Sequence, residues 1–131
     1  MSEAPSARSG APHFPAQALI DAYGNGGFRF ADMSHRGSLL SLPDGIWAWD
    51  VADPRDIDER SLKQALAQHD LIDTLLIGTG TSIVPLHAPL RALLRQMSIQ
   101  ADAMQTGAAI RTYNIMIGER RRVAAALIAV E

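Results

Sequence analysis

The chain has 131 residues, of which 47% are hydrophobic, and this length suits one compact domain rather than two. Its formal net charge is -2 and charged residues make up 20% of it, which argues against a nonspecific binder of nucleic acid or anionic lipid. Cysteine is absent, so disulfides, thiolate metal sites and a cysteine nucleophile are excluded.

The first twelve residues, "MSEAPSARSGAP", are mostly small and include prolines. They predict a disordered tail over residues 1–12, followed by a single domain over residues 13–131. The tail lacks the apolar stretch of a secretory signal, and the longest apolar runs, such as "VAAALIAV", fall far short of the roughly 18 to 20 residues that span a bilayer. We therefore expect a soluble, cytoplasmic protein without a transmembrane segment.

The opening third of the domain is predicted to be rich in β-strands. In "ALIDAYGNGGFRFA", residues 18–31, two apolar runs flank a glycine cluster, which is typical of a hairpin. In "GSLLSLPDGIWAWDV", residues 37–51, a Pro-Asp-Gly turn predicts a second hairpin. Alternation places Trp47 and Trp49 on one side of its second strand. The tryptophans are expected to cover one sheet face, or one of them anchors a partner.

Helical periodicity begins in "DPRDIDERSLKQALAQHD", residues 53–70. This segment predicts a helix of about three turns, capped by Asp56 or Asp58. The acidic residues of this region are read as a solvated, capping turn rather than as catalytic carboxylates. They are Asp53, Asp56, Asp58 and Glu59.

The second half alternates strands with helices. The apolar run "LIDTLLIG", residues 71–78, predicts a central buried strand, and "APLRALLRQM" then predicts a helix. "SIQADAM", residues 98–104, and "RRVAAALIAV", residues 121–130, predict two further strands. This order indicates an α/β fold in which a right-handed crossover joins parallel neighbours, so that the carboxyl ends of their strands share one edge of the sheet.

The run "IGTGTS" begins like a dinucleotide-binding fingerprint. The pattern fails because Ile83 stands where a third small residue is needed, and no Gly-Lys pair of a phosphate loop is present. Two readings remain open, a plain tight turn and a phosphate cradle without nucleotide specificity.

The stretch "MQTGAAIRTYN", residues 104–114, predicts a helix start. Thr106 is a good N-cap, and the small residues after it would leave the first-turn amides accessible to an anion, with Arg111 adding charge. In the alternative, the small residues allow close packing on the sheet and Arg111 pairs with Asp102 or Glu119. The candidate anion pocket comprises Gly78, Thr79, Gly80, Thr81, Thr106, Gly107, Arg111 and Asn114.

The same helix should bury Ile110, Tyr113 and Ile117, which recur at helical spacing, and should present Arg111 and Asn114 on its other face. No catalytic residue, metal site or cofactor motif is predicted, because no serine lies in a Gly-x-Ser-x-Gly elbow and the histidines lack ligand spacing. The histidines are His13, His35, His69 and His87.

The segments "LLIGTG", "MQTGAAIRTYN" and "ERRRVAAALI" resemble the Mth938-domain family of unknown function, which includes mitochondrial NADH:ubiquinone oxidoreductase (complex I) assembly factor 3 and the adipogenesis-associated Mth938-domain protein. The resemblance runs from about His13 to Val130. Gln105 stands where an aspartate is frequent, and Ile110 where a cysteine is frequent.

The resemblance implies a single three-layer α/β domain with a mixed, mainly parallel central sheet after the β-rich N-terminal portion. It implies no established enzymatic activity. By analogy, it implies a binding or assembly module whose protein partners are subunits of a membrane respiratory complex. The alternative function is a small-anion or small-molecule binding protein or enzyme that uses the candidate pocket.

Overall fold

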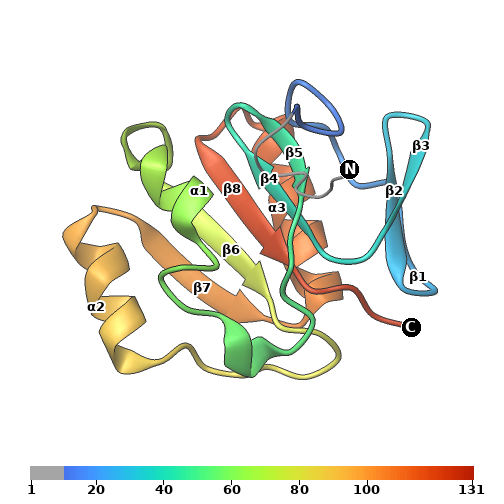
Figure 1. Ribbon diagram of the computed structural model, residues 1–131. Coiled ribbons are helices and arrows are strands. Elements are labelled where there is room, and N and C mark those ends of the chain that lie inside the picture. The colour runs from blue at the N-terminus through green and yellow to red at the C-terminus, as the bar shows by residue number, and fades with distance from the viewer. Residues whose placement is uncertain (1–10) are drawn as a thin grey trace.

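The computed structural model describes residues 11–131 (Figure 1). Most of the predicted tail, residues 1–10, lies outside the described residues. The strands are β1 (Ala22–Gly24), β2 (Gly27–Phe30), β3 (Met33–Arg36), β4 (Leu39–Leu42), β5 (Gly45–Ala48), β6 (Thr74–Gly78), β7 (Gln100–Met104) and β8 (Val123–Leu127). The helices are η2 (Pro54–Asp56), α1 (Lys63–Ala67), η3 (His69–Leu71), α2 (Ala88–Gln96) and α3 (Thr106–Gly118).

The strands form two sheets, and the expected α/β class is confirmed. The small sheet is antiparallel in the order β1-β2-β3, so the first predicted hairpin gains a third strand that no prediction anticipated. The large sheet is mixed, in the order β5-β4-β8-β6-β7. Strand β6 pairs in parallel with both β8 and β7, whereas β4 pairs in antiparallel fashion with β8 and with the second hairpin strand, β5.

The elements stack in three layers, with α1 and α2 on one face of the large sheet and α3 and the small sheet on the other (Figure 1). Strand β8 shows the alternation clearly, because Ala124 and Ala126 pack towards α1 and α2 while Ala125 packs towards α3. Ile110 and Tyr113 of α3 are buried on the α3 side of the sheet, as their spacing predicted, whereas Ile117 is only partly buried there.

Trp47 and Trp49 are both buried on the face of the large sheet that α1 and α2 cover, so the prediction that they cover one sheet face is confirmed. Each indole N–H has a partner, since Trp47 donates to the Asp44 carboxylate over 2.8 Å and Trp49 donates to the Ser61 carbonyl over 2.8 Å. Both rings therefore serve the core rather than an exposed partner surface.

The helix predicted over residues 53–70 is shorter than expected, because only Lys63–Ala67 is α-helical. Ile57 and Leu62 are both buried, and residues five apart would lie on different sides of one continuous helix. The chain therefore turns before α1. The prediction that Asp56 or Asp58 caps this helix is wrong, because Leu62 is the N-cap residue of α1 and no side chain caps it. Asp58 instead closes the turn before α1: its carboxylate accepts from the Ser61 N–H over 2.8 Å, and the Ser61 hydroxyl accepts from the Asp58 N–H over 3.0 Å.

Candidate functional site

The carboxyl ends of β6 and β7 meet at one edge of the large sheet, as the strand order predicted. The Thr79 N–H donates to the Met104 carbonyl over 2.8 Å, and the Thr106 N–H donates to the Gly80 carbonyl over 2.9 Å. The loop after β6 and the start of α3 are thus joined directly. The structure brings the two halves of the predicted pocket together.

The predicted role of Thr106 is wrong. Gln105 occupies the N-cap position of α3 and makes no side-chain cap, while Thr106 is the first helical residue and is fully buried. The Thr106 hydroxyl accepts from the Gly80 N–H over 3.0 Å and donates to the Ile128 carbonyl over 2.8 Å. Both backbone groups are buried next to strand ends. Bonding them stabilises the fold more than a helix cap would, because an unpaired buried polar group is costly.

Close packing explains the small residues here. A Cβ atom on Gly78 would lie 2.9 Å from the Thr106 Cα atom, which real structures do not tolerate. The Ala109 side chain, on the following helical turn, is fully buried against the sheet side of α3. Helix α3 therefore approaches the end of β6 so closely that only glycine fits at position 78, in agreement with the packing alternative.

Tyr23 was not predicted as part of this edge, yet its hydroxyl occupies the space where a Gly107 side chain would begin. The residue belongs to β1 and remains 44% exposed. Its ring therefore covers part of the first turn of α3, where the anion was expected. No local signal in the sequence relates Tyr23 to Gly107, because the contact depends on how the small sheet packs against α3.

Asn114 acts as a clamp rather than as a free polar group. Its side-chain amide donates to the Ile20 carbonyl over 2.9 Å, and its carbonyl oxygen accepts from the Ile20 N–H over 2.9 Å. These two bonds fix the segment before β1 to α3. The side chain is consequently satisfied without a ligand.

Arg111 is exposed, and within residues 11–131 it pairs with neither Asp102 nor Glu119. Glu119 instead lies 3.6 Å from Arg121. The predicted structural pairing of Arg111 is therefore wrong: the guanidinium faces solvent.

The remaining threonines of the predicted pocket differ from each other. The buried Thr79 hydroxyl donates to the Ser82 carbonyl over 2.6 Å and accepts from the Val84 N–H over 3.1 Å, so it holds the loop after β6 in place. Thr81 is exposed. Anion binding at this edge stays a prediction, and Thr79, Thr106 and Asn114 have their polar groups bonded within the protein.

Replacing Arg111 by alanine should change the free energy of unfolding by less than about 0.5 kcal/mol, because the side chain is exposed and has no ion-pair partner within residues 11–131. If Arg111 binds an anion, phosphate at one hundred times its dissociation constant would stabilise wild type by about 2.7 kcal/mol and the variant by much less. Thermal melts with and without phosphate measure both effects. Equal phosphate responses in the two proteins would exclude Arg111 from an anion site.

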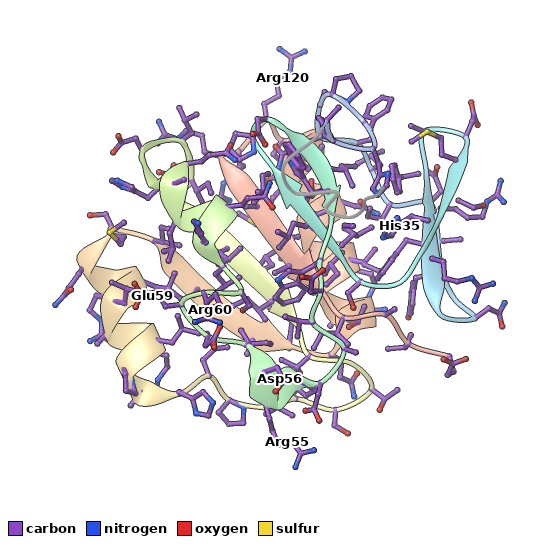
Figure 2. All side chains as sticks on the ribbon, viewed as in Figure 1. His35, Arg55, Asp56, Glu59, Arg60 and Arg120 are labelled. Carbon is purple, nitrogen blue, oxygen red and sulfur yellow. The ribbon has the colours of Figure 1, made fainter. Side chains whose placement is uncertain are left out.

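Four cavities found in the described part of the chain are lined by residues outside the predicted pocket. The largest, about 690 Å³, lies beside the turn before α1, with Asp56 and Arg60 among its lining residues (Figure 2). Arg55 extends away from the body of the protein and pairs with Asp53 over 2.7 Å. Hydrogen bonding to Arg55 lowers the pKa of the Asp53 carboxyl to about 2.

The histidines include one close pair. The rings of His13 and His35 have their centroids 4.8 Å apart, and the His35 ring contacts the Ser38 carbonyl through Nε2 over 3.0 Å. Burial, together with the nearby His35, lowers the pKa of His13. Within residues 11–131 no group of three or more histidine and carboxylate side chains is placed to hold a metal ion.

Comparisons with known proteins agree with this architecture. A family model described as "Protein of unknown function (DUF498/DUF598)" matches residues 20–128. The Mus musculus protein NADH dehydrogenase (ubiquinone) 1 alpha subcomplex assembly factor 3 is 30% identical over 115 residues, which cover 88% of this chain. The chain spans only 62% of the length of that relative.

Solved structures are also similar. A Bartonella henselae protein, described as an outer membrane protein, is 51% identical with a TM-score of 0.88, over 91% of this chain and 100% of that one. A Bordetella pertussis protein described as a Mth938-like domain is 26% identical with a TM-score of 0.75, over 98% of this chain and 90% of that one. Among the described residues of the present chain, no helix has the length and apolar character needed to cross a membrane.

Proposed function

The chain belongs to the DUF498/DUF598 family of proteins of unknown function, and it is similar to a solved Mth938-like domain. From this membership we propose that it is a non-enzymatic module that assists the assembly of a membrane respiratory complex. The supporting observation is the alignment of 88% of the chain with a relative that is named as an NADH dehydrogenase assembly factor. The partners in this proposal are subunits of such a complex, met at the cytoplasmic side of the membrane.

The way polar side chains are used also supports binding rather than catalysis. At the sheet edge, where open α/β folds place ligands, Thr106 holds two backbone segments together. Asn114, more than two turns further along α3, likewise bonds to the backbone of Ile20. Large apolar side chains are exposed elsewhere, and an assembly factor needs such surface for its partners. Leu19 is 47% exposed and Ile115 is 63% exposed, and each adjoins a residue of the Asn114–Ile20 clamp.

Deletion of the gene in its host tests the proposal. We expect less assembled NADH:quinone oxidoreductase on native gels and lower NADH oxidation in membranes, with both restored by the wild-type gene. Another respiratory complex of the same membranes serves as the control and should be unaffected. Normal levels of every respiratory complex in the deletion strain would refute the assembly role.

The competing proposal is a small-anion protein that uses the sheet edge. It draws support from Arg111, which is exposed and without an acidic partner in residues 11–131. The phosphate melts of wild type and Arg111→Ala decide whether it stands. The deletion experiment does not depend on that outcome, so the two proposals can fail separately.

A further inference from the structure

Strand β7 lies at the outer edge of the large sheet, next to α2 (Figure 1). Its inner neighbour is β6, with Leu76 opposite Asp102 in the parallel register. The Gln100 N–H donates to the Asp73 carbonyl over 2.9 Å, and the Met104 carbonyl accepts from the Thr79 N–H. In this register the backbone groups of Gln100, Asp102 and Met104 point towards β6.

It follows that Ala101 and Ala103 direct their N–H and C=O groups outward, away from the sheet. No hydrogen bond to these groups is made within residues 11–131. The opposite edge of the sheet is different, because β5 is paired by the segment before β1: the His13 N–H donates to the Ile46 carbonyl over 2.8 Å, and the Phe14 carbonyl accepts from the Ile46 N–H over 3.0 Å. One edge is covered, and the β7 edge is open to another strand.

A cavity of about 390 Å³ lies along this open edge, between β7 and α2. Leu94, Ile99 and Ala101 give it apolar walls, and Arg91 and Arg95 are exposed at its side. Within residues 11–131, no acidic residue lines the cavity and neither arginine forms an ion pair. The cavity is therefore suited to an acidic side chain that reaches the arginines.

We propose that the β7 edge binds an extended, acidic segment of a partner protein, which adds a strand to the large sheet. The partner backbone pairs with the free groups of Ala101 and Ala103, and a glutamate or aspartate side chain enters the cavity beside Arg91 and Arg95. This assignment rests on the proposed function only in requiring that the partner be a protein.

A second copy of the chain is a poor occupant of the same edge. Antiparallel pairing of two β7 strands places the α2 helices of both copies on the same face of the joined sheet. Arg91 and Arg95 of the two copies would then line one side of the seam, and the two Asp102 side chains would lie on the other. Like charges on both faces oppose this pairing.

The probe is a fluorescent peptide of about eight residues that alternates valine with glutamate, compared with the same peptide carrying lysine for glutamate. By anisotropy we expect the glutamate peptide to bind at least about tenfold more tightly than the lysine peptide. The double variant Arg91→Glu/Arg95→Glu should lose about tenfold or more in affinity. Arg29→Glu is the matched control, since Arg29 is an exposed arginine on β2, and its affinity should stay within about twofold.

The backbone part of the proposal has its own readout. Ala103→Pro removes an outward N–H, so it should leave a cooperative thermal melt and weaken peptide binding at least about tenfold. In wild type, amide hydrogen exchange at Ala101 and Ala103 should slow when the glutamate peptide is added. The assignment would be overturned if the peptide does not bind, if both peptides bind equally, or if binding gives no such protection. It would also be overturned if the protein forms a dimer that Ala103→Pro dissociates.

These results are separate from the gene-deletion result. If deletion impairs respiratory-complex assembly and the Ala103→Pro gene restores it fully, the assembly role stands and the β7 assignment falls. If the peptide protects β7 but deletion leaves every respiratory complex normal, the edge is a peptide-binding site and the assembly role falls.

Discussion

Thr106→Val is expected to lower the free energy of unfolding by about 2 to 5 kcal/mol, because it leaves two buried backbone groups without a partner. The Gly80 N–H and the Ile128 carbonyl both bond to the Thr106 hydroxyl, and the side chain is fully buried. Valine keeps the shape of the side chain, so the loss reports the hydrogen bonds rather than a cavity. Urea denaturation of wild type and variant measures it.

Thr106→Ser is the matched control. Serine keeps the hydroxyl and loses one methyl group, so it should cost no more than about 1 to 1.5 kcal/mol. A valine variant as stable as wild type, or a serine variant as unstable as the valine variant, would show that these hydrogen bonds do not hold the sheet edge together.

Tyr113 should make the protein sensitive to alkaline pH. Its phenol is fully buried between Ser41, 2.6 Å away, and the Ala18 carbonyl, to which it donates over 2.7 Å. Burial raises the pKa of Tyr113 from 10.0 to about 12, and the two hydrogen bonds only partly oppose this shift. Below pH 10.0 the phenol is neutral in both folded and unfolded chains, so its contribution to stability is complete.

Between these two pKa values the unfolded chain releases the proton while the folded chain keeps it, so stability falls as pH rises. The loss approaches about 3 kcal/mol above the folded pKa. Urea denaturation at a series of alkaline pH values measures the slope. Tyr113→Phe should be less stable at neutral pH but should lose this part of the slope, whereas Tyr23→Phe, at an exposed tyrosine, should keep it. Equal slopes in wild type and Tyr113→Phe would contradict the assignment.

Much of the fold could be predicted because its signals are local. The glycine cluster after Tyr23 and the turn at Asp44 each favour a hairpin, and both hairpins are present. The buried run 74–78 between two helical segments indicated a parallel crossover, and β6 does pair in parallel with β7. Turn chemistry and periodicity act within a few residues, so they can be read from sequence without knowing which segments meet.

The candidate site was only partly predictable. The strand order was enough to place the loop after β6 beside the start of α3, because carboxyl ends of parallel neighbours share an edge. The role of each side chain could not be predicted from the strand order. Asn114 bonds to a residue 94 positions away, and Tyr23 covers Gly107 from another sheet. The open edge of β7 likewise depends on which strand ends the sheet.

The sequence by itself therefore determined the α/β class and most of the element types, because these follow from periodicity and turn preference, but it did not determine β3 or the short length of α1. Only the tertiary structure decided that Thr106 is a buried link between strand ends rather than a helix cap. Local preference for a cap contributes about 1 kcal/mol, while leaving two buried backbone groups unpaired costs more. The Thr106 hydroxyl therefore bonds to Gly80 and Ile128, which tertiary packing places beside it although both are distant in the sequence.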